Sequence, residues 1–198
     1  MRIGVIALQG DFAEHIATLS RFDVDALPIR LPSQLDKLDG IVIPGGESTT
    51  LNRLIAEYTL IEPIRELAYQ GLPMWGTCAG MVLLAKKVTN SENGSLGIMN
   101  IEVERNAFGR QVDSFESELS IPALGTRPFP GIFIRAPIIR AVGAEVQTLC
   151  QLSSGAIVAA KEENCLVCSF HPELTDDLRF HNYFLTLARG DEFTKGSY

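Results

Sequence analysis

A cysteine stands between two glycines at residues 76–80, which read Gly-Thr-Cys-Ala-Gly. The pattern G-x-C-x-G is the thiol counterpart of G-x-S-x-G, which displays a nucleophile at a sharp turn between a strand and a helix. There the helix dipole would favour the thiolate of Cys78, and the N–H of Ala79 would be free to donate to an oxyanion. The alternative is a buried cysteine at an ordinary turn bounded by glycine.

A histidine and an acid follow an apolar run near the end of the chain, in His171-Pro172-Glu173. A thiol nucleophile needs a base, and the base needs a group that orients it. Residues i and i+2 of an extended chain point to the same side, and Pro172 keeps the segment out of a helix. We therefore expect Glu173 to accept a hydrogen bond from His171. The other histidines, His15 and His181, are interpreted as surface or packing groups in helices.

A glycine pair forms a third candidate stretch, within residues 41–50, which read IVIPGGESTT. Gly45-Gly46 allows backbone N–H groups to turn toward a ligand, so that Gly46 could supply a second oxyanion donor. The peptide between two glycines can also adopt more than one orientation at little steric cost. The Ser-Thr-Thr run at residues 48–50 is well suited to cap a helix.

The elements that must position these groups alternate between strand and helix in the first half of the chain. Apolar runs predict strands over residues 3–8, 25–31, 39–50 (ending in the glycine turn) and 72–76. Helical spacing predicts helices over residues 11–22, 51–71 (broken near Pro63) and 79–88. This alternation implies a parallel sheet with helices on both faces, whose functional groups gather at the carboxyl ends of the strands.

The second half differs, because residues 95–170 consist of short, β-rich segments before a helix predicted over 176–190. The strongest loop signal is the glycine- and proline-rich stretch 125–131. No internal repeat or linker divides the chain. We expect one domain over residues 1–198, of the α/β class, with three layers around a mostly parallel, flavodoxin-like sheet.

The chain has 198 residues, a formal net charge of −7, and 46% hydrophobic and 21% charged residues. This composition is typical of a globular domain, and the acidic balance argues against a nucleic-acid binder. No apolar run approaches the ~20 residues of a membrane span. The N-terminus leads into a strand-like pattern rather than a signal peptide. We expect a cytoplasmic protein with no membrane or nucleic-acid partner.

Four cysteines are present, and in a cytoplasmic protein we expect them to be reduced thiols. Cys165 and Cys168 have the C-x-x-C spacing of some metal and redox sites. Their surroundings are apolar and no second cysteine pair accompanies them, so we interpret them, like Cys150, as packing groups in buried strands.

On these motifs the chain resembles the triad (class I) glutamine amidotransferases. Several stretches are similar to one narrower family, the glutaminase subunits of pyridoxal 5′-phosphate synthase: ALQGDFAEHI, IPGGESTT, GTCAGMVLLAK, RNAFGRQVDSFE, FIRAP and SFHPELTDD. The cysteine elbow and the HPE triplet are shared by many amidotransferases, whereas PGGESTT and RNAFGRQ with DSFE are specific to this family. The resemblance runs from about residue 4 to residue 185.

The resemblance implies that the protein hydrolyses L-glutamine and passes ammonia to a separate (β/α)8 synthase subunit in a hetero-oligomer, without a metal or organic cofactor. It implies a triad of Cys78, His171 and Glu173. It also places glutamine near six residues, namely Gly46, Glu47, Ser48, Arg105, Ile134 and Arg135. Read without the resemblance, the two arginines are surface charges beside strands, and a structural ion pair at Arg135 stays open.

Three other functions remain open from the sequence. The chain could be an amidotransferase subunit that feeds ammonia to a different acceptor. It could be a non-catalytic regulatory module that kept the fold, although such a module needs no intact triad. It could also be a small α/β thiol hydrolase or chaperone with the same elbow, which would not require the HPE triplet.

Overall fold

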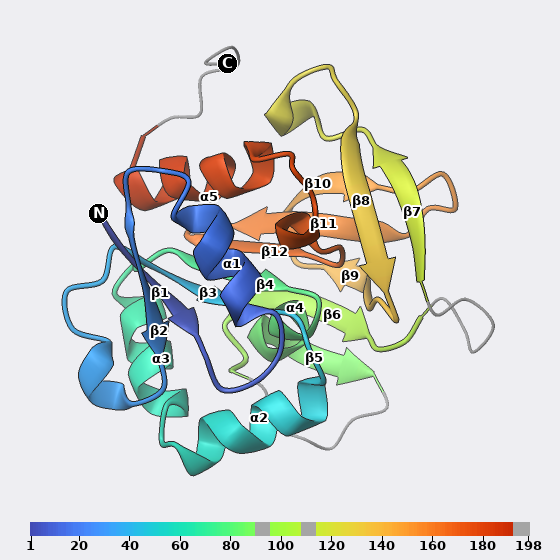
Figure 1. The fold of residues 1–198 in the computed structure, drawn as a ribbon. Coiled ribbons are helices and arrows are strands. Elements are labelled where there is room, and N and C mark those ends of the chain that lie inside the picture. Colours follow the sequence, from blue (N-terminus) through green and yellow to red (C-terminus); the bar gives the residue numbers. More distant parts are fainter. Residues whose placement is uncertain (90–95, 108–113, 192–198) are drawn as a thin grey trace.

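The computed structural model describes residues 1–89, 96–107 and 114–191, in which helices cover both faces of a central sheet (Figure 1). Five parallel strands form one half of this sheet, in the spatial order β2, β1, β3, β4 and β12. Their bounds are Arg2–Ile6 (β1), Asp25–Ile29 (β2), Gly40–Ile43 (β3), Met74–Thr77 (β4) and Cys165–Cys168 (β12).

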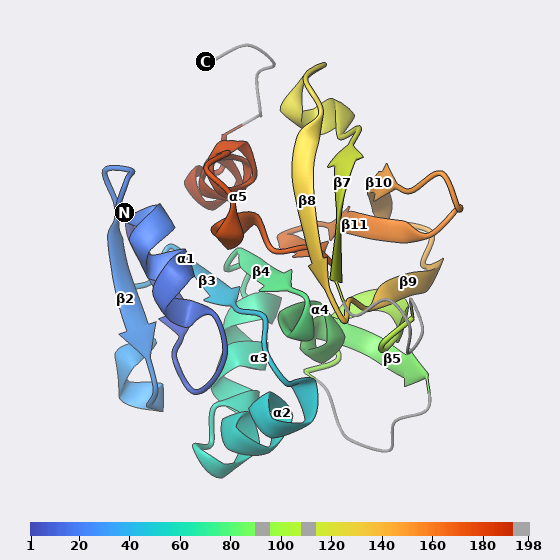
Figure 2. The same ribbon diagram turned by 45° about the vertical axis from the view of Figure 1, so that its right-hand side comes forward.

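The other half of the sheet is mostly antiparallel and continues from β12 through β11, β9, β6 and β5, with β10 paired to β11. These strands are β5 (Ala85–Thr89), β6 (Met99–Glu104), β9 (Ile138–Val142), β10 (Gln147–Gln151) and β11 (Ile157–Glu162). A separate antiparallel pair, β7 (Ser114–Leu119) and β8 (Phe129–Ile134), stands beside this half (Figure 2).

Helices α1 (Phe12–Leu19) and α5 (Arg179–Arg189) pack on one face of the sheet. Helices α2 (Ser48–Glu57), α3 (Ile61–Tyr69) and α4 (Ala79–Leu84) pack on the other. Three short 3₁₀ turns connect elements: η1 (Pro32–Gln34), η2 (Pro122–Leu124) and η3 (Pro172–Leu174). The predicted α/β fold, with a mostly parallel sheet between two helical layers, is confirmed.

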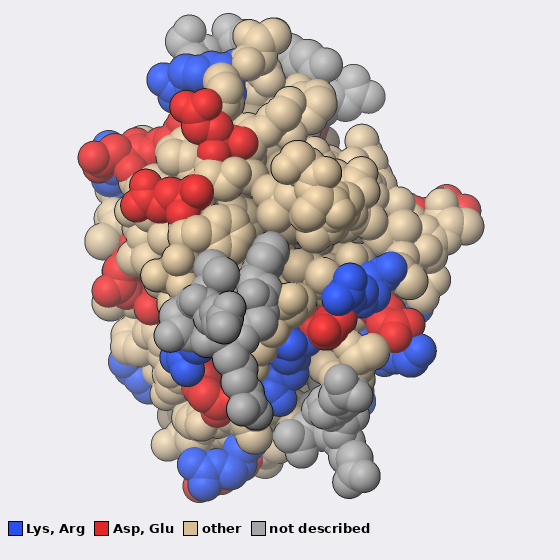
Figure 3. All heavy atoms as spheres, turned by 90° about the vertical axis from the view of Figure 1, so that its right-hand side faces the viewer, with Lys and Arg blue, Asp and Glu red and all other residues tan. Residues whose placement is uncertain are grey.

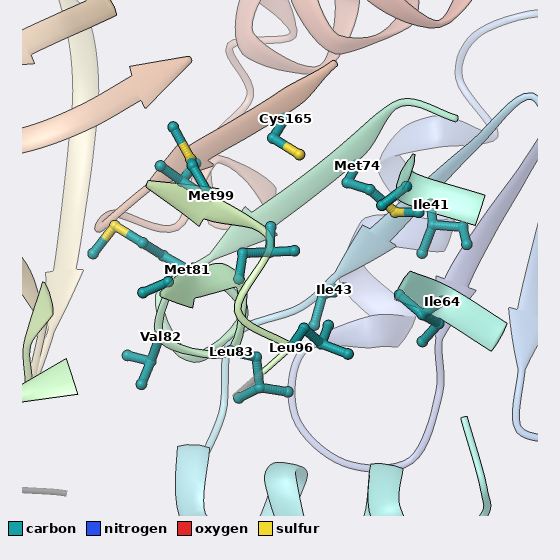
Figure 4. Close-up of a cluster of buried hydrophobic side chains, with 14 of the residues drawn as sticks. Ile41, Ile43, Ile64, Met74, Met81, Val82, Leu83, Leu96, Met99 and Cys165 are labelled. Carbon is teal, nitrogen blue, oxygen red and sulfur yellow. The ribbon is translucent and has the colours of Figure 1, made fainter. Parts of the chain in front are cut away.

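Strand β3 shows why the parallel strands read as continuous apolar runs. Ile41 and Ile43 point into a core shared with α2, α3 and α4, where Ile64, Met74 and other apolar side chains meet (Figure 4). Val42, between them, points into the second core, under α1 and α5. Because both faces of the strand are buried, every residue must be apolar.

One predicted helix is wrong in part. The helix expected over residues 79–88 ends at Leu84, and residues 85–89 form strand β5. Ala85 turns the chain to an extended conformation, with φ of −64° and ψ of 136°. The following residues pair with β6 at the edge of the sheet, where the exposed side chain of Lys87 suits a strand with one open side.

The helix expected over residues 51–71 is two helices, and its break does not lie at Pro63. The break covers residues 58–60, where Thr59 has a left-handed φ of 54°. Pro63 lies in the first turn of α3, where a missing backbone N–H removes no hydrogen bond within the helix.

The side of the molecule that carries β5 to β9 has positive and negative side chains next to one another (Figure 3). Lys87 pairs with Glu102 at 2.8 Å, and Arg140 pairs with Glu104. Mixed charge of this kind does not form the broad basic surface that a phosphate backbone needs. Within residues 1–89, 96–107 and 114–191, no helix has the length and apolar character of a membrane span.

The start of α4 lies directly against β3 and β4, and two glycines make this contact possible. A Cβ atom at Gly80 would lie 1.9 Å from the carbonyl oxygen of Ile43, and one at Gly76 would lie 2.5 Å from the carbonyl carbon of Gly80. Any side chain at either position would overlap backbone atoms. The glycines on both sides of Cys78 are therefore required by the close approach of helix and sheet.

We predict that Gly80→Ala destabilises the protein, although alanine favours a helix by about 1 kcal/mol over glycine. The added methyl group would force α4 away from β3 in a packed core, which costs about 1–3 kcal/mol or more. Denaturant unfolding should show a lower free energy of unfolding. Gly71→Ala is the comparison, because its Cβ meets no atom within 4 Å and only its φ of 91° is unfavourable. A Gly80→Ala protein more stable than Gly71→Ala would contradict the close-contact account.

Candidate active site

Cys78 occupies the turn between β4 and α4 in a strained backbone conformation, with φ of 47° and ψ of −101°. Its N–H donates to the carbonyl of Cys168 on β12 at 2.8 Å, so the turn is tied to the neighbouring strand. Ala79 is the first residue of α4, and a first N–H has no acceptor within its own helix. A residue held in such a conformation by its surroundings is typical of a functional site.

His171 and Glu173 are joined by a short hydrogen bond, with 2.7 Å between Nδ1 of His171 and Oε1 of Glu173. Both side chains are buried. The predicted extended geometry is wrong here: His171 precedes the 3₁₀ turn η3, in which Pro172 is the first residue and Glu173 the second. Proline is well tolerated at that first position, so the turn, rather than a strand, brings the carboxylate back to the ring.

Asp11 is a second carboxylate near the His171 ring, with 3.4 Å between its Oδ2 and Nδ1 of His171. Burial by itself lowers the pKa of His171, but hydrogen bonds with Asp11, Cys78 and Glu173 outweigh it, so the pKa lies above its ordinary value. Burial raises the pKa of Glu173, and His171 opposes that rise. The surroundings thus favour a protonated His171 beside the thiol.

A pocket of about 240 Å³ opens at the carboxyl ends of β3 and β4. It is lined by every predicted site residue except Glu173, which lies behind His171: Gly46, Glu47, Ser48, Cys78, Ala79, Arg105, Ile134, Arg135 and His171. The lining also includes four residues that the sequence did not indicate, namely Asp11, Val82, Asn106 and Pro137. Asp11 could have been suspected from its place after the first strand, where polar groups approach the site.

The glycine turn is fixed by residues after β1. The carbonyl of Gly45 accepts a hydrogen bond from the N–H of Asp11 at 3.2 Å, and Oε1 of Gln9 accepts one from the N–H of Glu47 at 3.0 Å. Gly46 has φ of 144°, and a Cβ there would lie 2.5 Å from Oε1 of Gln9. The Gly45–Gly46 peptide is therefore held in one orientation by a bond that would have to break before it could rotate.

The residue that caps α2 is Glu47, not one of the three hydroxyl residues expected to do so. Its carboxylate accepts from the N–H groups of Thr49 at 3.0 Å and Thr50 at 2.6 Å. Desolvation raises the pKa of Glu47, but hydrogen bonds from Thr50 and Thr49 lower it to about 2. A carboxylate at a helix N-terminus also gains from the helix dipole. Glu47 is thus an anion on the pocket wall.

Two arginines reach the pocket from different elements. Nη2 of Arg105 donates to Oγ1 of Thr49 at 3.0 Å and lies 3.4 Å from Oε1 of Glu47, so it joins the chain after β6 to the start of α2. Arg135 follows β8 with a left-handed φ of 42°. It forms no ion pair with another residue of the described ranges, so the structural ion pair considered for it is not seen there.

The other three cysteines are buried, and all four thiols are free. Cys165 and Cys168 lie three residues apart on β12 and therefore point into different cores. Burial raises the pKa of Cys150 to about 11 and that of Cys165 to about 12, and it holds the pKa of Cys168 well above its ordinary value. The interpretation of the C-x-x-C as packing groups is confirmed.

His15 and His181 are fully buried, with His15 beside Glu173 and His181 beside His15, so of the two interpretations, surface or packing groups, the first is wrong. The spacing of apolar residues in the first helix already indicated that His15 is buried. His15 follows Phe12 by three residues and precedes Leu19 by four, which puts it on the apolar stripe of α1. What the periodicity could not show is that this stripe ends against a carboxylate.

The fold, with its mostly parallel sheet and a cysteine at a turn between strand and helix, is that of the class I glutamine amidotransferases. Residues 5–189 match the SNO glutamine amidotransferase family, and the chain belongs to that family. This membership rules out the small thiol hydrolases and chaperones that the elbow alone left open.

Two curated relatives have the name pyridoxal 5′-phosphate synthase subunit PdxT. The protein of Carboxydothermus hydrogenoformans is 56% identical over 93% of this chain and 96% of its own length. That of Bacillus velezensis is 52% identical over 95% of both chains. A solved structure described as a glutamine amidotransferase has a TM-score of 0.89 and 44% identity, over 94% of this chain and 98% of its own. The structure of PurLQS from Thermotoga maritima shares the fold alone, with a TM-score of 0.69, 14% identity and coverage of 93% and 97%.

We predict that a chloroketone analogue of glutamine labels Cys78 alone among the four cysteines. Cys78 lines the pocket at the start of α4, whereas the other three thiols are buried and hold their protons at neutral pH. Peptide mapping after partial labelling would locate the adduct. Adducts found mainly on Cys165 or Cys168 would contradict this assignment and restore a reactive C-x-x-C.

Proposed function

We propose that residues 1–198 act as one domain, the glutaminase subunit of a pyridoxal 5′-phosphate synthase, which hydrolyses L-glutamine to L-glutamate and ammonia. The observation that carries the proposal is the meeting of Cys78 and His171 in one small pocket, with Glu173 bonded to the far nitrogen of the ring. Membership of the family and the names of full-length relatives support the same activity.

In the proposed mechanism, the thiolate of Cys78 attacks the side-chain amide carbon of glutamine. The carbonyl oxygen becomes an oxyanion, stabilised by the N–H groups of Gly46 and Ala79. His171 then gives its proton to the leaving nitrogen, and ammonia departs as the thioester forms. Nε2 of His171 is the nitrogen available for this transfer, because Glu173 occupies Nδ1.

The second half of the cycle uses the same groups in reverse. With ammonia gone, the neutral His171 removes a proton from water, whose oxygen attacks the thioester carbon. The C–S bond breaks, glutamate leaves, and the thiolate and imidazolium are restored. Glu173 stabilises the imidazolium and keeps Nδ1 of the ring occupied throughout, as the acid does in a Ser-His-Asp triad. These steps need only protein groups and water.

The pocket also offers charges that match a free amino acid. We assign the α-carboxylate of glutamine to the guanidinium groups of Arg105 and Arg135, and its ammonium group to Glu47. Ser48 and the backbone around Ile134 provide neutral contacts along the substrate. A pocket of about 240 Å³ has room for a free amino acid of this size.

The destination of the ammonia distinguishes the remaining alternatives. We infer a (β/α)8 synthase subunit as the acceptor, in a hetero-oligomer in the cytoplasm, because the full-length relatives are named as subunits of pyridoxal 5′-phosphate synthase. A subunit for a different acceptor would be expected to match relatives of another name. A regulatory module would have no use for a thiol, base and acid placed together.

We predict that Cys78→Ala abolishes glutamine hydrolysis while the protein stays folded, since only a small thiol is removed. His171→Asn should be nearly as damaging because the general base is lost. Glu173→Gln should lose less, because the base remains but is poorly oriented. The measurement is glutamate release in the presence of the synthase subunit, with thermal unfolding as the control for folding. Near-normal turnover by Cys78→Ala would refute the triad.

We also predict that the synthase subunit activates this chain. The carbonyl of the Gly45–Gly46 peptide is held by the N–H of Asp11. The oxyanion hole is complete only when the N–H of Gly46 in this peptide points toward the oxyanion, so it depends on the orientation of the peptide. Loss of one oxyanion donor typically costs about 10²–10³ in rate. Turnover of the isolated chain should therefore be low and should rise by about that factor when the synthase subunit is added at saturation. A rate that is already high without the partner would show that the oxyanion hole is preformed.

A further inference from the structure

Two buried histidines from different helices form a chain that leads to the second carboxylate oxygen of Glu173, with His15 next to that oxygen and His181 behind His15. Nε2 of His15, on α1, is 3.3 Å from Oε2 of Glu173 and 3.2 Å from Oγ1 of Thr77. Nδ1 of His15 is 3.3 Å from Nε2 of His181, on α5. All of these side chains are buried, and the proposed mechanism uses none of them except Glu173.

The surroundings of both imidazole rings favour their neutral form. Burial lowers the pKa of His15 well below its ordinary value, and the nearby His181 and His171 lower it further. Burial also lowers the pKa of His181 to about 3, with a contribution from Arg21. Trp75 packs edge-on against both rings, with centroids 5.2 and 4.9 Å away, and both rings are fully buried.

The contacts select one tautomer for each neutral ring. A carboxylate oxygen only accepts, so a bare Nε2 of His15 would place two lone pairs 3.3 Å apart. With its proton on Nε2, His15 bonds to Thr77 and brings the same N–H to within 3.3 Å of Oε2 of Glu173, a buried oxygen that forms no hydrogen bond within the described ranges. Its Nδ1 is then bare and accepts from the Nε2–H of His181. The Nδ1 atom left over on His181 is buried and unpartnered in the described part of the chain. A buried ring nitrogen without a proton costs less free energy when it is unpartnered than a buried N–H group does.

We propose that His15 and His181 are positioning residues of the triad, which hold Glu173 as a carboxylate through its second oxygen. The role rests on the proposed glutaminase function. In this arrangement the Nε2–H of His181 donates to His15, whose own Nε2 lies 3.3 Å from the second oxygen of Glu173. Because these donors are neutral, they stabilise the Glu173 carboxylate without forming a second ion pair that would compete with the imidazolium of His171.

The other groups facing Glu173 do not supply that donor. Asp11 carries a like charge and raises the pKa of Glu173, while His171 occupies Oε1. Cys168, beneath the site, holds its proton and donates to the carbonyl of Phe170 instead. His15 is thus the neutral group placed to offset the burial of the second oxygen.

The test is His15→Phe, which keeps a ring of similar shape and removes both nitrogens. Measured with saturating synthase subunit, kcat should fall about 10-fold, the cost of removing the polar N–H that lies beside a buried carboxylate oxygen. The unpaired carboxylate holds its proton more readily, so the acidic limb of the kcat–pH profile should move up by about one pH unit. KM for glutamine should change little, because His15 does not line the pocket. His15→Gln, which returns an N–H near the position of Nε2, should recover most of both effects.

Asn164→Leu is the matched control, because it removes two hydrogen bonds, to the carbonyls of Ala68 and Leu72, away from Glu173. It should lower the thermal stability without moving the pH profile. An unchanged profile in a folded His15→Phe would overturn the role.

If that variant does not fold, ¹⁵N NMR of the wild-type chain decides, since the sequence has only 3 histidines. Neutral rings with the proton on Nε2 at His15 and His181 support the role, and a proton on Nδ1 of His15 overturns it. A wild-type complex that releases no glutamate would instead contradict the proposed function.

Discussion

The direct contact between the first turn of α4 and the backbone of β3 is the constraint on which the rest of the site depends. Gly80 lies so close to the carbonyl of Ile43 that no side chain fits between them. This contact forces the chain to turn sharply after β4 and holds Cys78 in a left-handed conformation at the start of the helix. The thiol, the free N–H of Ala79 and the pocket in front of them all follow from that turn.

The sheet then determines which groups can reach the thiol. β12 lies beside β4, so the segment after it places His171 next to Cys78, and β1 brings Asp11 to the same edge. The carboxylate of Glu173 lies one layer deeper, under α1 and α5, where water cannot stabilise it. The side chains of His15 and His181 from those helices take the place of water, so the helical layer contributes to the electrostatics of the site as well as to its packing.

Local signals in the sequence predicted the parallel half of the fold and most of the pocket. Continuous apolar runs, glycines at the elbow and the HPE triplet each depend on neighbours close in the chain, so their spacing is informative. The course of residues 85–89 was mispredicted because that strand depends on pairing with β6. The position of His15 against Glu173 was missed because it depends on how two helices pack on one face of the sheet. Periodicity identifies a buried stripe but not what the stripe meets.

The covalent intermediate offers the most direct test of the account, because only a thiol nucleophile aided by His171 and Glu173 requires a γ-glutamyl thioester at Cys78. The complex with the synthase subunit would be mixed with glutamine, quenched in acid during turnover, and digested for mass spectrometry. We expect the γ-glutamyl group on the peptide that contains Cys78 and on no other. Sustained glutamate release with the acyl group on a different residue would contradict the central claim.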